Sequence, residues 1–314
     1  MNISVVVPVY NSAQSLRLLV DRLEPVLREC ADQFELVLVD DESQDDSWEV
    51  IVSLSSERSW IRGFQLMQNS GQHSALLCGI RAAWYDVIVT IDDDLQHPPE
   101  EIPKLLEELG RGADVVYGTP ELEHHNFLRV LSSRLTRLAL KSAMGIDVAR
   151  NVSAFRAFRT HVRDGFASYS GSFVSIDVLL TWATTRFAAT PVRHDERQYE
   201  SSQYTLRKLV THALNMMTGF SVVPLQVASL AGVIFTLFGF GVLTLVLVRW
   251  FIYGSVVPGF AFLASIISVF AGAQLFALGI IGEYLARMHF RIMDRPPYVI
   301  RSERGPSADR PDTT

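Results

Sequence analysis

The 314-residue chain has few cysteines and lacks several motifs that define common enzyme classes. Its two cysteines, Cys30 and Cys78, are too few for a disulfide framework and do not have the spacing of metal ligands. Both lie in apolar helical patterns, so we expect buried thiols and a reducing compartment for the first domain. No G-x-G-x-x-G follows the first predicted strand, and neither G-x-S-x-G nor H-E-x-x-H occurs. These absences argue against a dinucleotide-binding dehydrogenase, a serine hydrolase with a nucleophile elbow and a zinc peptidase.

The chain also lacks an excess of basic residues. It has 28 Lys and Arg against 34 Asp and Glu, a formal net charge of −6. A nucleic-acid-binding protein normally carries a basic face, so we expect no nucleic-acid partner. Met1–Val5 begins directly with a strand pattern and has no basic region before an apolar core, so we expect no cleavable signal peptide.

Charged residues are almost absent between residues 209 and 282. No Lys, Arg, Asp or Glu occurs in Leu209–Val248 or Trp250–Gly282, so Arg249 alone interrupts the run. The uncharged stretches Val227–Val248 and Gly259–Gly282 hold 22 and 24 residues. A helix that crosses a bilayer needs about 20 residues. The sequence therefore predicts a transmembrane hairpin.

Basic residues flank this predicted hairpin on both sides. Arg207 and Lys208 precede the first span, and four arginines, Arg287, Arg291, Arg295 and Arg301, follow the second. The positive-inside rule then places both ends of the chain in the cytoplasm. We expect four parts: a domain over residues 1–204, an amphipathic interfacial helix over 205–226, two spans within 227–283, and a cytoplasmic tail over 284–314. Ser302–Thr314 is polar and Pro-containing, which predicts disorder.

The first 204 residues alternate β-branched apolar runs with amphipathic stretches. The predicted strands are Ile3–Val9, Phe34–Val39, Ile61–Met67, Asp86–Ile91, Asp114–Tyr117 and Phe187–Arg193. The predicted helices are Ala13–Glu29, one from Asp46 to about Ser56, His73–Trp84 and Pro99–Leu109. Strands separated by helices of this length predict an α/β domain with a mostly parallel sheet covered on both faces. Asn151–Arg159 has no clear pattern.

Polar and acidic groups follow three of these strands. The strand ends read Pro8-Val9-Tyr10-Asn11, Val39-Asp40-Asp41-Glu42-Ser43 and Ile91-Asp92-Asp93-Asp94-Leu95-Gln96. In open α/β sheets, ligands bind beyond the carboxyl ends of the strands, so these groups are expected to gather at one edge. Clustered carboxylates repel unless a cation is present, which favours a divalent ion held by Asp94 and Asp92. Solvated turns that cap the next helices are the alternative interpretation of both acidic loops.

In this order, the three strand ends resemble glycosyltransferase family 2, whose fold is the Rossmann-like GT-A fold. The tail resembles a narrower group, the polyprenyl-phosphate glycosyltransferases related to dolichol-phosphate mannose synthase. Its matching segments are Ser202–Lys208, Gly279–Tyr284 and Arg295–Tyr298. The resemblance covers roughly residues 3–301. The chain departs from the family pattern at Ser12, Asp93, Ala154 and Glu200.

The resemblance implies a role for each matching position. The nucleotide-sugar would contact Pro8, Tyr10, Asn11, Asp40, Asp41, Asp92 and Asp93. The catalytic positions would be Asp92, Asp94 and Gln96, with a Mg²⁺ or Mn²⁺ ion on Asp94 and Asp92. The acceptor phosphate would contact Arg129, Arg156, Ser202, Tyr204, Arg207 and Lys208.

The resemblance also implies an activity, the inverting transfer of a hexose from a nucleotide-sugar to a polyprenyl phosphate. UDP-glucose is the first expected donor. The expected location is the inner membrane, with the catalytic domain in the cytoplasm and contacts between copies through the spans. A processive polysaccharide synthase is one alternative, but two spans are few for a pore and no Q-x-x-R-W motif occurs. A non-catalytic membrane scaffold is another, against which the Asp92–Asp94 pair argues.

Overall fold

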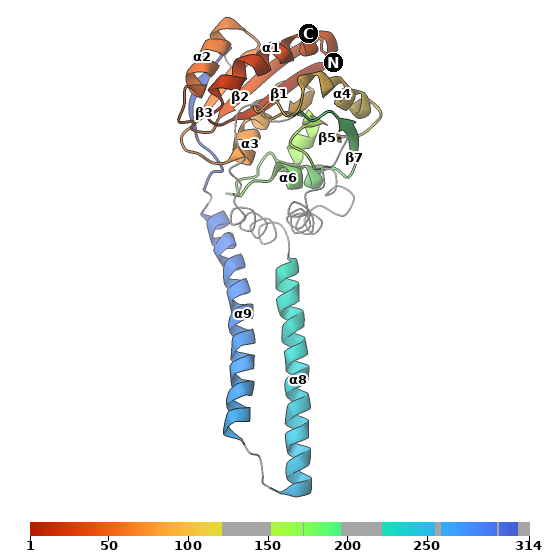
Figure 1. Ribbon diagram of the computed structural model, residues 1–314, viewed down its shortest axis with the longest axis vertical. Coiled ribbons are helices and arrows are strands. Elements are labelled where there is room, and N and C mark those ends of the chain that lie inside the picture. Colours follow the sequence, from red (N-terminus) through yellow and green to blue (C-terminus); the bar gives the residue numbers. More distant parts are fainter. Residues whose placement is uncertain (121–151, 172, 196–221, 255–258, 294, 307–314) are drawn as a thin grey trace. The chain divides into compact units, whose positions relative to one another are not determined.

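The chain forms two compact units in a computed structural model (Figure 1). Met1–Leu206 and Asp294–Thr314 make up the first, the sheet unit, and Arg207–Met293 the second, the hairpin unit. The structure describes residues 1–120, 152–171, 173–195, 222–254, 259–293 and 295–306.

A sheet of eight strands organises the described part of the sheet unit, in the order β7-β5-β6-β4-β1-β2-β3-β8. β1 pairs in parallel with β2 and β4, β2 with β3, and β5 with β7. β6 and β8 run antiparallel to their neighbours. The mostly parallel α/β sheet predicted from the sequence is therefore confirmed. The strands are β1 (Asn2–Val9), β2 (Gln33–Asp40), β3 (Ile61–Leu66), β4 (Val87–Thr90), β5 (Val115–Pro120), β6 (Arg156–Arg159), β7 (Phe187–Val192) and β8 (Ile300–Arg304).

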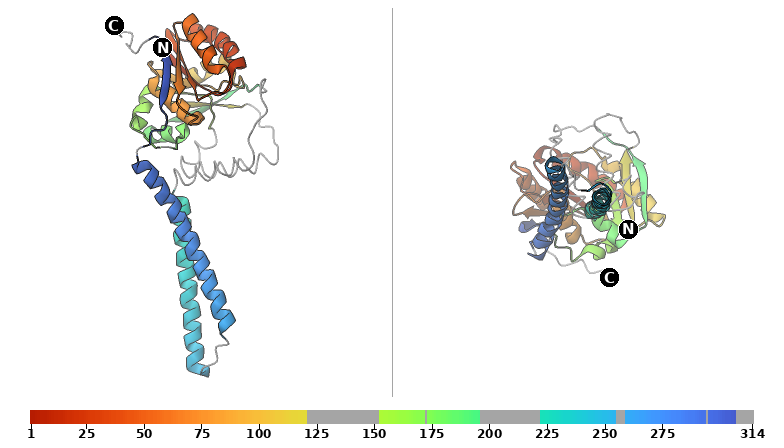
Figure 2. Two further views of the ribbon diagram at one scale, coloured as in Figure 1. Left: turned by 90° about the vertical axis from the view of Figure 1, so that its left-hand side faces the viewer. Right: turned by 90° about the horizontal axis from the view of Figure 1, so that it is seen from below.

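Helices cover both faces of this sheet (Figure 1, Figure 2). On one face lie α1 (Ala13–Cys30), α2 (Ser47–Glu57) and α4 (Ile102–Gly110), and on the other α3 (Gln72–Ala82), α6 (Ile176–Ala183) and the 3₁₀ segment η3 (Thr160–Phe166). Neighbouring residues of β1 serve different cores, because Val5 packs on the α1 side and Val6 on the α3 side. A strand covered on both faces is apolar over most of its length, as β1 is from Val5 to Val9.

The C-terminal segment returns to the sheet, so the predicted disorder of Ser302–Thr314 is wrong for Ser302–Arg304. Within β8, Ser302 pairs with Gln65 of β3 and Glu303 with Phe64. Gly305 follows at φ +109°, and a Cβ there would lie 2.7 Å from the Ile61 carbonyl oxygen. The prediction rested on the polar composition of this segment, which does not reveal that the segment pairs with the otherwise open edge of β3. Residues 307–314 lie outside the described part.

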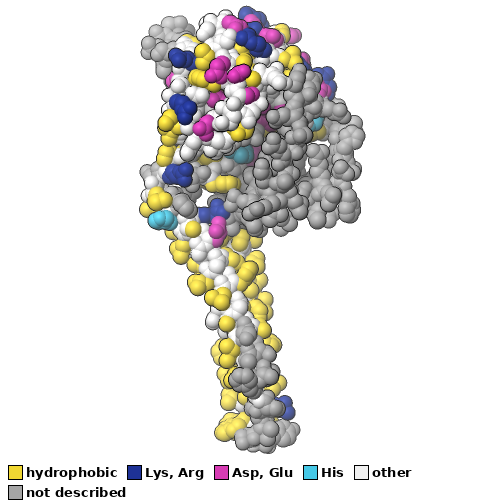
Figure 3. Space-filling view, turned by 60° about the vertical axis from the view of Figure 1, so that its left-hand side comes forward, with side chains coloured by type: hydrophobic (Ala, Val, Ile, Leu, Met, Phe, Trp, Pro, Cys, Tyr) yellow, Lys and Arg dark blue, Asp and Glu magenta, His cyan; other side chains and the backbone are white. Residues whose placement is uncertain are grey.

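The hairpin unit consists of α8 (Val223–Tyr253) and α9 (Phe260–Ile292), with 31 and 33 residues. The segments Val223–Ile252 and Val269–His289 have mean hydropathies of 2.5 and 1.5, and Ala228 is the only buried residue among their described side chains. On the face seen in Figure 3, hydrophobic side chains predominate along the described part of the hairpin unit, whereas most charged side chains lie on the sheet unit. Both helices are thus long and apolar enough to cross a membrane. Most of the helix predicted over 205–226 lies outside the described residues.

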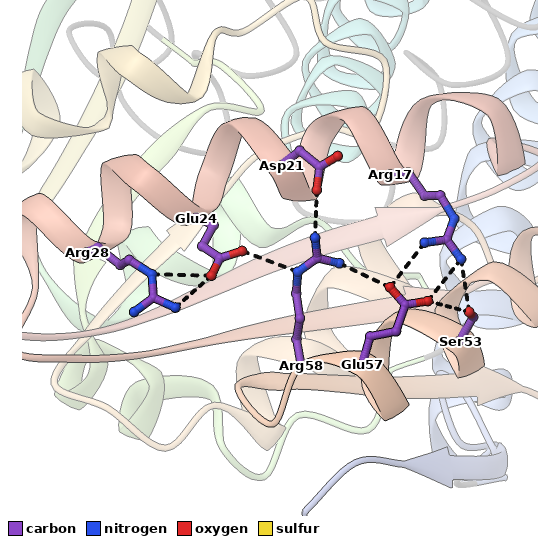
Figure 4. Close-up of polar contacts among 7 residues, drawn as sticks. All are labelled: Arg17, Asp21, Glu24, Arg28, Ser53, Glu57 and Arg58. Carbon is purple, nitrogen blue, oxygen red and sulfur yellow. Dashed lines mark hydrogen bonds and ion pairs between the residues drawn. The ribbon is translucent and has the colours of Figure 1, made fainter.

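Two kinds of ion pair hold the sheet unit together. Glu35 and Arg62 form a buried pair at 3.0 Å, with side chains 3% and 4% exposed. The Glu35 carboxylate also accepts hydrogen bonds from the Ser4 hydroxyl and the Trp84 N–H, and the Arg62 guanidinium lies 3.8 Å from the centre of the Trp84 ring. On the surface, a chain of ion pairs joins α1 to α2 through Arg58, which contacts Asp21, Glu24 and Glu57 (Figure 4).

We expect Arg62→Leu to lower the free energy of unfolding by about 3–5 kcal/mol, because it leaves the Glu35 carboxylate buried without its cation. Arg28→Leu is the control, since it removes the exposed pair between Arg28 and Glu24 at 2.7 Å and should cost at most about 1 kcal/mol. Urea unfolding of the detergent-solubilised protein, followed by tryptophan fluorescence, measures both. Equal losses in the two variants would contradict the difference between the buried and the surface pair.

Candidate active site at the carboxyl ends of β1, β2 and β4

Three neighbouring strands each end in a strained residue. Asn11 after β1, Glu42 after β2 and Leu95 after β4 have φ values of 55°, 60° and 61°. Within the described residues these are the only non-glycine positions with positive φ. Such conformations cost free energy and concentrate at functional sites, where the surrounding structure holds them. Because β1 pairs in parallel with β2 and β4, the three strand ends lie at one edge of the sheet, as the sequence predicts.

Hydrogen bonds tie the end of β1 to the end of β2. The Asn11 N–H donates to the Ser43 hydroxyl at 3.0 Å, and the Asn11 side-chain oxygen accepts from the Gln44 N–H at 2.7 Å. Tyr10, with 47% of its surface exposed, presents an aromatic ring at this edge. Pro8 is buried within β1, opposite Val39. Of the predicted nucleoside contacts from β1, Tyr10 is thus accessible and Pro8 is not.

The two aspartates at the end of β2 are both buried. Asp40 is 0% exposed, and its Oδ2 has no hydrogen-bond partner. Burial raises the pKa of Asp40. The Asp41 carboxylate accepts the backbone N–H groups of Ser70 and Gly71 at 2.7 and 2.8 Å. Burial raises the pKa of Asp41 to about 6, while these two hydrogen bonds act in the opposite direction. Asp41 therefore holds the loop after β3, and a direct nucleoside contact would need that loop to move.

The three aspartates after β4 point to different partners. Asp92 accepts from the Gln72 side-chain amide at 2.7 Å, and Asp94 accepts from the Gln96 N–H at 3.1 Å. Asp93 accepts the Tyr10 N–H at 3.3 Å, which joins the ends of β4 and β1. Burial raises the pKa of Asp93 to about 7, and the nearby Asp92 carboxylate adds to this shift.

Asp92 and Asp94 offer hard oxygen ligands of the kind that Mg²⁺ and Mn²⁺ prefer. Among the described residues no group of three or more His, Cys, Asp or Glu side chains could hold a metal ion. A Mg²⁺ ion in an enzyme is commonly held by one or two carboxylates together with substrate phosphates and water. Two carboxylates at the strand end fit that arrangement.

Arg156 at the start of β6 lies at the same edge, because Thr90 at the end of β4 is its partner in the sheet. The side chain is 2% exposed and forms an ion pair with Asp177 of α6. Its Nε also donates to the Thr90 hydroxyl at 3.1 Å. Tyr117 donates its hydroxyl to Asp177 at 3.2 Å, and burial raises the Tyr117 pKa well above its usual value. For Arg156 to bind a lipid phosphate, as the resemblance implies, the pair with Asp177 would have to open.

Sequence reasoning overlooked His97, which follows Gln96. Its ring lies against Phe155 at 5.4 Å between centroids and against His194 at 4.9 Å. Burial lowers the pKa of His97 to about 4, so the imidazole is neutral at pH 7. Asp177 was also overlooked, because an acidic residue in the first turn of a helix is common and carries no signal of a buried pair. Five predicted acceptor residues lie outside the described part of the chain: Arg129, Ser202, Tyr204, Arg207 and Lys208.

Comparison with known proteins gives matches over the whole chain. The profile described as Glycosyl transferase family 2 matches residues 4–163. The undecaprenyl-phosphate 4-deoxy-4-formamido-L-arabinose transferase of Yersinia enterocolitica is 32% identical over 302 residues, or 95% of this chain and 92% of the relative. The protein of that name from Pectobacterium carotovorum is 33% identical over 317 residues, or 100% of this chain and 96% of the relative.

Among solved structures, glucosyl-3-phosphoglycerate synthase from Mycobacterium tuberculosis in complex with phosphoglyceric acid is similar with a TM-score of 0.48. It is 19% identical, and the match covers 69% of this chain and 78% of that one. The family profile covers the first half of the chain, where β1–β6 and the strand-end carboxylates lie, and the relatives match nearly all of the chain. The resemblance found in the sequence is thus confirmed, and the chain belongs to glycosyltransferase family 2, as an enzyme with the GT-A fold.

Proposed function

We propose that this enzyme transfers a sugar from a nucleotide-sugar to undecaprenyl phosphate at the cytoplasmic face of a membrane, with inversion at the anomeric carbon. The observation that carries the proposal is the extent of the similarity. Relatives named for transfer to undecaprenyl phosphate match the family 2 domain and also the segment that contains α8 and α9. An enzyme that modifies a lipid needs both a donor site and a place at the membrane, and this chain has residues suited to each.

The acceptor's chemistry explains why no dedicated base is needed. A sugar hydroxyl must lose a proton to attack, whereas a phosphate monoester has a second pKa of about 6 and arrives as an anion. In a single displacement, an acceptor oxygen forms a bond to the anomeric carbon as the bond to the nucleoside diphosphate breaks, which inverts that carbon. The difficulty is that two anions must approach one another, so opposite charge on each side is required.

Residues at the strand ends suit the donor side of this reaction. Asp92 and Asp94 would hold a Mg²⁺ or Mn²⁺ ion, which neutralises charge on the leaving diphosphate. Tyr10 would pack against the nucleoside with its exposed ring. Gln96, two residues beyond Asp94, would contact the sugar.

UDP-glucose is the donor that we propose first, and the name of the relatives favours a nucleotide-linked 4-deoxy-4-formamido-L-arabinose as the second. A panel of nucleotide-sugars supplied with undecaprenyl phosphate distinguishes the two. Release of nucleotide that depends on both donor and lipid phosphate identifies the substrate. Release without lipid, or with no donor of the panel, would contradict the proposal.

We expect Asp94→Asn to reduce kcat/KM roughly 100-fold or more, because the loss of a metal ligand raises the activation free energy by several kcal/mol. Asp46→Asn makes the same chemical change at the exposed N-cap of α2, where no side-chain cap bond is formed, and should leave the rate unchanged. Excess chelator should abolish transfer by the parent enzyme, and Mg²⁺ or Mn²⁺ should restore it. Near-normal turnover of Asp94→Asn would remove this residue from the metal site.

Arg207 is proposed to bind the acceptor phosphate through two N–H groups at once, which Lys cannot do. We therefore expect Arg207→Lys to raise the KM for undecaprenyl phosphate strongly while the KM for the nucleotide-sugar stays near its parent value. Arg249→Lys is the control, because it makes the same change near the other end of α8, at a residue outside the proposed acceptor site, and it should leave both KM values unchanged. If Arg207→Lys transfers sugar as well as the parent, Arg207 serves only to anchor the chain at the membrane surface.

The proposed topology places both ends of the chain in the cytoplasm and the connection between α8 and α9 outside. A cysteine at Ser255, in that connection, should react with a membrane-impermeant maleimide in intact cells. A cysteine at Ser59, which is exposed on the sheet unit, should react only after the membrane is permeabilised. The parent, whose Cys30 is half-buried and Cys78 buried, provides the background. Labelling in the reverse order would overturn the topology.

A further inference from the structure

The Met67–Gly71 loop joins β3 to α3 and reaches the acidic strand ends. Its Ser70 and Gly71 N–H groups bind the Asp41 carboxylate, and its Asn69 N–H donates to Glu42 at 2.8 Å. The next residue, Gln72, donates to Asp92 at 2.7 Å. A short loop thus connects the end of β2 with the end of β4, on either side of the place where the nucleotide-sugar is proposed to bind.

The other end of this loop is held by the segment that returns after α9. The Met67 N–H donates to the Val299 carbonyl at 2.8 Å, and the Arg301 guanidinium donates to the Met67 carbonyl at 3.1 Å. The β3–β8 pairing changes register between Gln65 and Leu66, immediately before these two bonds. Only two residues separate Met67 from Ser70, so the position of Met67 restricts where the N–H groups that bind Asp41 can lie.

Tyr298 holds the helix that follows the loop. Its ring packs among the buried residues on the α3 side of the sheet, and the Arg81 guanidinium lies 5.9 Å from the ring centre. Arg81 also donates to the Tyr169 and Ala167 carbonyls. Because α3 begins at Gln72, a contact that fixes α3 also fixes the amide that binds Asp92. The returning segment therefore acts on both ends of the loop.

We infer that Tyr298 and Arg301 are positioning residues of the donor site, which set the Met67–Gly71 loop in the conformation that binds the nucleotide-sugar. This role rests on the proposed function, because it assigns donor binding to the edge where the loop lies. Neither residue touches the reacting atoms. They act through Met67 and α3 on the hydrogen bonds to Asp41 and Asp92.

Point variants of the 314-residue enzyme test this role. Arg301→Ala should raise the KM for the nucleotide-sugar roughly three- to tenfold, because one hydrogen bond to the loop is lost. The kcat and the KM for undecaprenyl phosphate should stay within about twofold. Arg301→Lys keeps a donor and should recover most of the loss. Tyr298→Ala should behave like Arg301→Ala, and Tyr298→Phe, which keeps the ring but loses the hydroxyl contacts with Arg81 and Cys78, should lie between Tyr298→Ala and the parent.

Hydrogen–deuterium exchange supplies a measurement that does not depend on activity. The amides of Asn69, Ser70 and Gly71 should exchange faster in Arg301→Ala and Tyr298→Ala than in the parent. The control is Arg304→Ala, at an exposed position of β8 that pairs with Gly63 far from the loop, and it should change neither exchange nor KM.

Unchanged loop exchange and donor KM in Arg301→Ala and Tyr298→Ala would overturn the inference, as would equal effects in Arg304→Ala. A parent enzyme that transfers no sugar to lipid phosphate would instead contradict the proposed function. Loop exchange would still decide whether the two residues position the Met67–Gly71 loop.

Discussion

Repulsion among carboxylates at one sheet edge is the constraint on which the site depends. Asp40, Asp41 and Asp92–Asp94 follow two strands that both neighbour β1. Like charges placed this closely destabilise one another unless they are hydrogen-bonded, protonated or paired with cations. The protein uses the first remedy within its own structure. Backbone N–H groups bind Asp41, and burial raises the pKa of Asp93 to about 7. For Asp92 and Asp94 we propose the third remedy, a divalent ion.

Much of this arrangement could be predicted from residue patterns. The apolar runs of β1 and β2, and the spacing of Leu16, Leu19 and Leu23 in α1, define elements whose ends lie within one or two residues of those observed. The strand-end positions of Asp41 and Asp94 followed from the rule for parallel sheets. The two long apolar helices likewise followed from the absence of charge. These features are local, so one stretch of sequence is enough to specify them.

Features that depend on distant partners could not be predicted. The four residues of β6 form a strand only because β4 and β5 lie on either side. Asp177 in the short helix α6 gains its role from the ion pair with Arg156, a residue of a different element. β8 depends on the open edge of β3, more than two hundred residues earlier in the chain. The hydrogen bonds of Asp41 could not be predicted either, because the donors Ser70 and Gly71 lie in the loop after β3 and not in the loop that contains Asp41.

The place of β8 in the sheet has a consequence for biosynthesis. Arg62 and Glu303 interact at 3.3 Å across a sequence separation of 241 residues. A ribosome makes both apolar helices before it makes this last strand, so the sheet is completed only after the hairpin has emerged. Until then β3 is an unprotected edge that could pair with another chain. A nascent chain that stalls within the hairpin would therefore have an incomplete sheet, which quality-control factors could recognise. A complete sheet, in contrast, requires that the whole hairpin has been synthesised.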